Sequence, residues 1–253
     1  MKDTSWEKVT NWYENLTGEE GHYYHQELII PSLVKKIVAL GARSTLDIAC
    51  GQGVLSRALP PEINYLGLDL SKSLIEAAKK RNKRKNHRFV HGDARDFKFD
   101  HLFDCAAVIL AIQDIDDINK VFQSAYNALN VDGRLFIVMN HPCYRIPRQS
   151  RWSIDEGNKM QVRIVQAYMN EMQIPIQTRP SKDRQSHQVY HHHRPLQTYF
   201  HALKQTGFLI EDFEEWVSNK MSTGKYRKME NRAREEFPLF VCITAVKIAA
   251  FED

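Results

Sequence analysis

A glycine-containing turn is the part of this sequence whose residue types and spacing could do specific chemistry. Residues 46–53 read Leu-Asp-Ile-Ala-Cys-Gly-Gln-Gly, so a short apolar run leads into a turn with Gly51 and Gly53. A nucleotide-bearing ligand needs close approach to the backbone at such a turn, where Cβ atoms would obstruct it. A helix that begins there offers free N–H groups to a carboxylate or a phosphate.

Two acids follow at places that suit the same ligand. Asp69 lies 22 residues after Asp47, at the end of a second apolar run. An acid there can accept hydrogen bonds from both hydroxyls of a ribose. Asp93 follows a third predicted strand, residues 87–92, and could accept a hydrogen bond from an adenine amino group. The sequence therefore predicts a nucleoside site assembled from the ends of successive strands.

Strands and helices alternate along the segments that would position these residues. The pattern predicts strands over residues 44–50, 65–69, 87–92, 103–110 and 133–140, and helices over 6–16, 31–40, 55–59, 71–85 and 118–129. Alternation of this kind is typical of a parallel sheet with helices on both faces. The fold class is α/β.

The alternation stops after His141, which divides the chain into three parts. Residues 1–141 hold N-terminal cover helices and the core of the nucleoside site. Residues 142–195 are rich in Pro, Arg and Gln and are predicted to be an insertion after strand five, helical over residues 160–172. Residues 196–253 complete the core, with a helix over 196–206 that Gly207 ends, strands over 208–217 and 237–247, and a charged connector between them.

The chain resembles the class I S-adenosylmethionine-dependent methyltransferases, closely over residues 28–141 and loosely in the last strands. The motifs that carry the resemblance are Asp47-Ile48-Ala49-Cys50-Gly51-Gln52-Gly53, Gly67-Leu68-Asp69-Leu70-Ser71, Gly92-Asp93-Ala94, Phe103-Asp104 and Gly133-Arg134-Leu135. The resemblance implies a Rossmann-like, seven-stranded, mostly parallel sheet whose last hairpin is antiparallel. It implies S-adenosylmethionine as cofactor, held by Asp47, Ala49, Cys50, Gly51, Gly53, Asp69, Leu70, Ser71, Asp93, Ala94, Ala111 and Ile112.

The glycine turn is open to two other interpretations. A dinucleotide-binding dehydrogenase would carry G-x-G-x-x-G, but position 56 is Ser, so the third glycine is missing. Asp47, at the entry to the turn, also suits a cationic sulfonium better than a pyrophosphate. In the other interpretation, the glycines only make a tight turn, which leaves the acids at the following strand ends unexplained.

The residues after strands four and five bear on the acceptor. Residues 110–114 read Leu-Ala-Ile-Gln-Asp, without the Asn/Asp-Pro-Pro-aromatic motif of enzymes that methylate exocyclic base amines. Asp114 and Asn140 could imitate the acids of metal-assisted methyltransferases, but we interpret them as surface turn residues and predict no metal.

The insertion is predicted to be an acceptor lid. Arginines and aromatic side chains follow strand five, where ligands of open α/β sheets bind, and Arg145 could hold a carboxylate or a phosphate. The same side chains could instead fix the loop by local salt bridges. In an extended segment His191 and His193 point the same way, so an imidazole could take a proton. His22 and His25 could close the other side of the site. The candidate catalytic residues are His141, Tyr144, Arg145 and His193.

Composition narrows the class of protein. The chain has 43% hydrophobic and 26% charged residues, so we do not expect disorder to be its dominant state. The four cysteines are scattered and form no CxxC pair, no apolar run approaches 20 residues, and no signal pattern is present. These features predict a cytoplasmic protein without membrane contact. The net charge is +4, and residues 79–85 form a basic run that is either a solvated helix end or a phosphate-contacting patch.

The sequence therefore predicts a methyltransferase that moves a methyl group from S-adenosylmethionine to O or N of a small molecule, possibly acidic or aromatic, by in-line displacement. An RNA or protein methyltransferase is the first alternative. Nucleic acid as a partner is possible but not favoured, because it would require the basic run to face the same edge as Gly51. A non-catalytic S-adenosylmethionine-binding protein is the second alternative.

Overall fold

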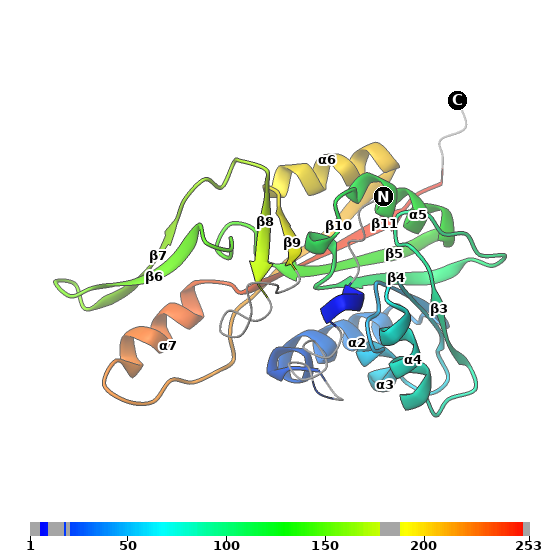
Figure 1. Ribbon diagram of the computed structural model, residues 1–253, viewed down its shortest axis with the longest axis horizontal. Helices are drawn as coiled ribbons and strands as arrows, with labels where there is room; N and C mark the ends of the chain where they lie inside the picture. Colours follow the sequence, from blue (N-terminus) through cyan, green and yellow to red (C-terminus); the bar gives the residue numbers. More distant parts are fainter. Residues whose placement is uncertain (1–5, 10–17, 19–20, 178–187, 250–253) are drawn as a thin grey trace.

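The part of the chain that the computed structural model describes covers residues 6–9, 18, 21–177 and 188–249. These residues form a seven-stranded sheet in the order β10-β11-β5-β4-β1-β2-β3 (Figure 1). Its strands are β1 (Ser44–Ile48), β2 (Asn64–Asp69), β3 (His87–His91), β4 (Phe103–Ile109), β5 (Leu129–Asn140), β10 (Phe208–Trp216) and β11 (Phe240–Lys247). Pairing is parallel from β3 to β5, and β11 is antiparallel to both β5 and β10. The predicted fold class and the antiparallel last hairpin are confirmed.

Helices cover both faces of the sheet. On one face α5 (Ile118–Ala128) and α6 (Leu196–Thr206) pack on the sheet, and on the other face lie α2 (Ile30–Ala39), α3 (Val54–Ala58) and α4 (Lys72–Arg81) (Figure 1). Because side chains alternate across a strand, neighbouring residues of β4 belong to different cores. Ala106 and Val108 pack in the cluster with α5, whereas Cys105 and Ala107 pack in the cluster with α2 and α3.

Strand β1 lies between β2 and β4, and this is where the order of strands along the chain reverses. Helix α3, which follows β1, and helix α5, which follows β4, lie on opposite faces of the sheet. The two chain segments therefore diverge at the carboxyl ends of β1 and β4 and leave a crevice between them. The backbone takes left-handed conformations at both exits, at Ala49 (φ 58°) and at Leu110 (φ 53°).

The insertion is built from strands, so the predicted helix over residues 160–172 is wrong. Its described residues form two hairpins, β6 (Ser150–Asp155) with β7 (Met160–Val165) and β8 (Met172–Gln177) with β9 (Gln188–His193). Met160, Val162 and Ile164 alternate with polar residues at a period of two, and this alternation outweighs the wider apolar spacing that suggested a helix.

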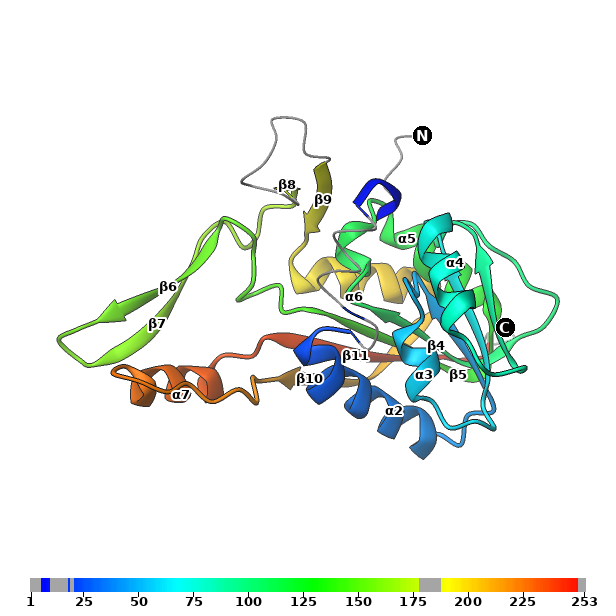
Figure 2. The same ribbon diagram turned by 60° about the horizontal axis from the view of Figure 1, so that its bottom comes forward.

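The charged connector also differs from the prediction, because it contains helix α7 (Arg227–Glu236). Helix α7 packs against β7, so the hairpin β6–β7 and α7 lie beside each other, away from the main sheet, in Figure 1 and Figure 2. The C-terminal part of the chain thus supports the insertion as well as completing the sheet.

Short helices precede the first strand and follow the fourth. They are η1 (Trp6–Val9), a π-helix η2 (His25–Ile29) that runs into α2, and η3 (Ile112–Asp114). Most of the helix predicted over residues 6–16 lies outside the described residues. Within the described part of the chain, no helix has the length and apolar character that crossing a membrane requires.

Replacing Gly53 by Ala tests how closely β3 and the glycine turn pack. Gly53 has φ +75°, and an added Cβ would lie 2.6 Å from a ring carbon of Phe89 in β3. We expect Gly53→Ala to lower the free energy of unfolding by about 2–4 kcal/mol, measured by urea denaturation, because backbone strain and overpacking add. Gly41→Ala is the control, with φ +69° but no atom within 4 Å. Equal losses for the two variants would contradict the close packing.

Candidate functional site

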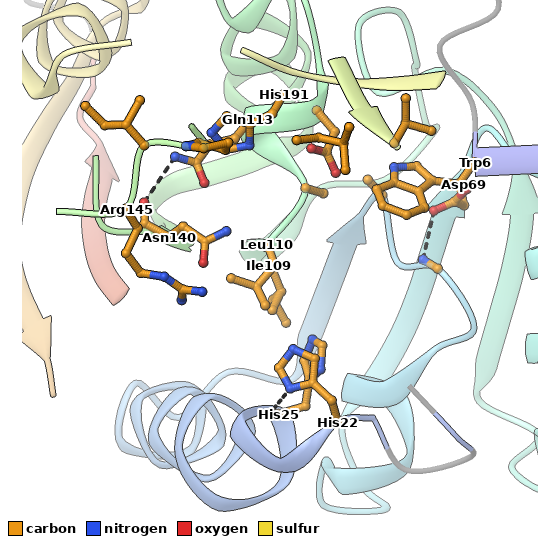
Figure 3. A pocket seen from close by; sticks show the side chains of 18 of the residues that line it. Trp6, His22, His25, Asp69, Ile109, Leu110, Gln113, Asn140, Arg145 and His191 are labelled. Carbon is orange, nitrogen blue, oxygen red and sulfur yellow. Dashed lines mark hydrogen bonds between the residues drawn. The ribbon is translucent and has the colours of Figure 1, made fainter. Parts of the chain in front are cut away.

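A cavity of about 470 Å³ opens at the crevice where β1 and β4 end. This volume is in the range of small-molecule sites, about 300–1,000 Å³. Figure 3 shows the side chains of the cavity arranged between two ends. The Asp69 end comprises Trp6, Ala49, Gly51, Asp69 and Asp114, and the Arg145 end comprises Gln113, Asn140, Arg145, Arg163 and His191. Ile109 and Leu110 lie between these ends (Figure 3).

Asp69 is held firmly by the backbone around it. Its carboxylate accepts hydrogen bonds from the N–H groups of Gly51 and Ser71, both at 2.8 Å. Burial raises the pKa of Asp69, and the two N–H donors oppose that rise. A smaller cavity of about 60 Å³ adjoins this end, and among its lining residues are Leu70, Asp93, Ala94 and Ala111.

Seven of the predicted cofactor residues therefore line one of these two cavities, and the others support them from behind. The lining ones are Ala49, Gly51, Asp69, Leu70, Asp93, Ala94 and Ala111. The supporting ones are Asp47, Cys50, Gly53, Ser71 and Ile112. Ser71 caps α4, and Ile112 is fully buried in the core.

The other two predicted acids, Asp47 and Asp93, are hydrogen-bonded to side chains of the protein. Asp47 is buried and accepts a hydrogen bond from the Tyr65 hydroxyl at 2.7 Å, and burial raises its pKa to about 7. Both Asp93 oxygens accept hydrogen bonds from the Arg95 guanidinium, which also bonds Asp116. If Asp93 binds an adenine amino group, it therefore has to do so while it keeps its ion pair with Arg95.

Trp6 and Asp114 are site residues that the sequence analysis missed. Asp114, interpreted there as a surface turn residue, lines the cavity beside Trp6. Burial raises the pKa of Asp114 to about 7, and its hydrogen bond with Trp6 opposes that rise. Glu7 anchors η1 to the start of α4 by accepting hydrogen bonds from Ser71 and Ser73. In the sequence, the helical spacing of apolar residues near the N-terminus was the pattern that could indicate a segment covering the site.

The Arg145 end is built by the loop after β5 and by the insertion. Gln113 donates from Nε2 to the Asn140 carbonyl at 3.1 Å, and Figure 3 shows this bond beside Arg145. The insertion adds Ser150, Arg163, Ile176, Val189 and His191 to the lining. The segment predicted to be a lid thus forms a wall of the cavity.

Of the four candidate catalytic residues, the structure brings only Arg145 into the main cavity. His141 is buried and bonds Glu215 at 2.7 Å, and His193 bonds the Tyr168 carbonyl at 2.8 Å. Tyr144 lines a neighbouring cleft. Residues that are close in sequence thus have different surroundings. His191, two residues before His193, lines the cavity instead.

Three histidines line the cavity, and all have depressed basicity. Burial, with a smaller contribution from the neighbouring His22, lowers the pKa of His25 to about 3, and burial together with nearby His193 and His192 lowers that of His191 to about 4. Burial also lowers the pKa of His22. All three rings are neutral at pH 7. Nδ1 of His25 and Nε2 of His191 are buried without a hydrogen-bond partner among the described residues.

Four unpartnered polar atoms therefore belong to residues of this one cavity. Besides the two ring nitrogens they are Oε1 of Gln113 and Nη1 of Arg145. Buried polar groups are nearly always hydrogen-bonded in native proteins, so this concentration indicates a site that a bound molecule completes.

The basic run lies elsewhere. Residues 79–85 extend from the last turn of α4 toward the start of β3, at the amino-terminal edge of the sheet, and none of them lines the cavity. Arg84 donates to the carbonyl groups of Ser56 and Leu59. Within the described ranges, there is no cluster of three or more His, Cys, Asp or Glu side chains that could hold a metal.

The depressed pKa of His25 makes a stability prediction. The unfolded chain takes up a proton near pH 6.5, whereas the folded protein does so only near pH 3, so stability is lost as pH falls between these values. We expect the free energy of unfolding to fall by about 2–3 kcal/mol more in the wild type than in His25→Asn between pH 7.5 and 4.5. Urea denaturation at the two values measures this, with His201→Asn, an exposed site on α6, as control. Identical losses in the wild type and His25→Asn would refute a neutral, buried His25.

Comparisons with known proteins agree with this geometry. Residues 46–137 match the family described as Methyltransferase domain. A demethylmenaquinone methyltransferase of Thermotoga maritima is 32% identical over 110 residues, 42% of this chain and 47% of that protein. A phthiotriol/phenolphthiotriol dimycocerosates methyltransferase of Mycobacterium leprae is 28% identical over 138 residues, 53% of this chain and 50% of that protein. The chain spans about half the length of these relatives.

Likeness among solved structures extends over more of the chain. An S-adenosylmethionine dependent methyltransferase of Mesorhizobium loti superposes with a TM-score of 0.64 at 24% sequence identity. The match covers 86% of this chain and 96% of that one, and it is a likeness of fold.

Proposed function

We propose that the chain is a class I S-adenosylmethionine-dependent methyltransferase that transfers a methyl group from S-adenosylmethionine to an oxygen or nitrogen atom of a small molecule bound in the cavity. The match of residues 46–137 to a methyltransferase domain and the likeness of fold support this proposal. The proposal rests on a single cavity that extends from Asp69, the last residue of β2, to a separate polar end at Arg145. Donor and acceptor need such adjoining places for an in-line displacement.

The Asp69 end suits S-adenosylmethionine by its place in the sheet and by its charge. It lies in the crevice where ligands of such sheets bind, and the backbone at Ala49 and Leu110 there is left-handed. The cavity places Asp69 and Asp114, two carboxyl groups with pKa values raised by burial, at this end. A cationic ligand would stabilise both as carboxylates, which suits a sulfonium donor.

The residues of the chain act mainly by position. Bound S-adenosylmethionine supplies an activated methyl group. Trp6 and the insertion exclude water around it, and Asp69, fixed by Gly51 and Ser71, orients the donor. An acceptor that arrives protonated needs a proton acceptor, and His25 and His191 present ring nitrogen atoms in the cavity wall that have no hydrogen-bond partner among the described residues. Burial keeps both rings weak bases, so positioning of donor and acceptor contributes more than proton transfer. His141 and His193 do not line the cavity and have no proposed role in the reaction.

The acceptor is proposed to be small. The named relatives act on a demethylmenaquinone and on phthiotriol dimycocerosates, which supports a small-molecule or lipid acceptor over a macromolecule. RNA is not favoured, because the basic run does not line the cavity. The predicted acidic or aromatic character of the acceptor stays a proposal, as does a cytoplasmic location, for which the four free cysteines are the support.

Methyl transfer itself is the test. The full chain is incubated with methyl-labelled S-adenosylmethionine and a panel of hydroxy- and amino-substituted aromatic acids, quinols and short RNAs. Label in a small molecule, with stoichiometric S-adenosylhomocysteine, is the expected result. Label only in RNA would replace the small-molecule proposal, and donor binding without turnover on any acceptor would favour a non-catalytic binder.

Replacing Asp69 tests the donor site. We expect Asp69→Ala to weaken S-adenosylmethionine binding by about 1–3 kcal/mol, because a charged hydrogen-bond acceptor is lost. Calorimetric titration measures the dissociation constant, and Asp100→Ala, an exposed carboxylate before β4, is the control. An unchanged affinity in a folded Asp69→Ala variant would rule out the ribose assignment.

A further inference from the structure

Two arginine side chains at the Arg145 end of the cavity have no acidic partner. Arg163 donates to the Tyr144 carbonyl and to the Ser150 hydroxyl, both at 2.7 Å, and its guanidinium lies 5.0 Å from the centre of the Trp152 ring. Arg145 lies 5.2 Å from the centre of the Phe240 ring. Neither forms an ion pair with any carboxylate in the described part of the chain.

This arrangement opposes the stability of the empty protein. Burial lowers the pKa of both guanidinium groups, and the charge of Arg163 lowers that of Arg145 further, so the two positive charges repel each other. Arginine nevertheless remains charged. Half-buried like charges without a counter-ion cost free energy, which a bound anion would recover.

Within the described part of the chain, no ion pair of the Arg145 side chain fixes its loop. Its Nη1 is buried without a hydrogen-bond partner within residues 21–177 and 188–249, and the loop is held by backbone bonds from Tyr144 and Arg145 to the His141 carbonyl. Figure 3 shows the guanidinium directed toward the cavity. The interpretation of Arg145 as part of a local salt bridge is therefore not supported.

The arginine pair can be reached by a ligand from two sides. Arg145 and Arg163 line the main cavity and also a cleft of about 430 Å³ between the β6–β7 hairpin and α7. Aromatic rings of Tyr144, Trp152 and Phe237 line this cleft. On the side of the main cavity, the neighbouring apolar residues are Ile146, Pro147, Ile176 and Val189.

The charges of the cavity are thus separated along its length. The carboxyl groups of Asp69 and Asp114 lie at one end, and the two guanidinium groups lie at the other. A cation at the first end and an anion at the second would satisfy both, whereas two cations or two anions would not.

We propose that the acceptor carries an anionic group, a carboxylate or a phosphate, which Arg145 and Arg163 bind together, while its apolar body lies against Ile146, Pro147, Ile176 and Val189. This inference rests on the proposed function only in calling the ligand an acceptor. Binding of an anion to the two arginines can be measured without that function. A planar, bidentate donor such as Arg145 suits either anion.

Calorimetric titration tests the anion site, with and without S-adenosylhomocysteine. The probes are 3-phenylpropionate, phenyl phosphate, inorganic phosphate and the neutral 3-phenylpropanol. We expect one or both aryl anions to bind at least about tenfold more tightly than the alcohol, because a charged hydrogen bond is gained. The tighter of the two identifies the anion as carboxylate or phosphate. Binding of the alcohol as tight as that of both aryl anions would overturn the proposal. Inorganic phosphate binding as tightly as phenyl phosphate would show that the apolar part of the ligand is not bound.

Variants assign the binding to the pair. Arg145→Gln should weaken binding of the aryl anion at least about tenfold and leave S-adenosylhomocysteine binding unchanged, whereas Arg145→Lys should restore part of the loss. Arg151→Gln is the matched control, because Arg151 is exposed on β6, next to Trp152. Wild-type anion affinity in Arg145→Gln would refute the assignment. If S-adenosylhomocysteine fails to bind while Arg145-dependent anion binding persists, the proposed function fails and the anion site stands.

Thermal unfolding without ligand separates a binding role from a structural one. Arg145→Met should melt no lower than the wild type, because it removes an uncompensated charge and keeps an apolar stem over Phe240. Addition of the aryl anion should raise the melting temperature of the wild type only. A large destabilisation in Arg145→Met would contradict the proposal.

Discussion

The placement of β1 between two parallel neighbours is the constraint on which the rest of the structure depends. Parallel pairing with β2 and β4 brings the carboxyl ends of all three strands to one edge. The helices after β1 and β4 cover opposite faces, so their connections must separate there. The backbone is left-handed at both exits, at Ala49 and at Leu110. The cavity is the consequence, and the cover at Trp6 and the insertion close it on other sides.

Polar groups in this cavity are arranged at a cost to the stability of the empty protein. Two carboxyl groups at one end, two guanidinium groups at the other, and the unpartnered nitrogen atoms of His25 and His191 are all partly or wholly buried. Each would be better solvated in the unfolded chain. Buried polar groups are nearly always satisfied in native proteins, so the distribution of charge supports the proposed ligands, a cation beside Asp69 and an anion beside Arg145.

Local patterns in the sequence predicted the sheet and the Asp69 end well, because both follow from short-range rules. The glycine turn, strand alternation and the acids after β1, β2 and β3 are each readable within a few residues. Where several patterns competed, prediction failed: residues 160–164 fit a strand, but wider apolar spacing suggested a helix. Alternation gives His191 and His193 a shared face but not the depth of each side chain, so it does not indicate which of the two lines the cavity.

Residues that reach the site through tertiary packing could not be located from sequence. Trp6 lines the cavity because Glu7 bonds the start of α4, more than 60 residues away along the chain. His25 reaches it through a π-helix beside Gly21, where an added Cβ would lie 2.6 Å from the His25 Cβ. Neither contact has a signature in local spacing.

Calorimetric titration of the full chain with S-adenosylhomocysteine, and separately with NAD⁺, tests the central claim most directly. We expect saturable binding of one S-adenosylhomocysteine per chain and no binding of NAD⁺. Binding of NAD⁺ in its place, or of neither ligand, would contradict the assignment of the Asp69 end to a methyl donor.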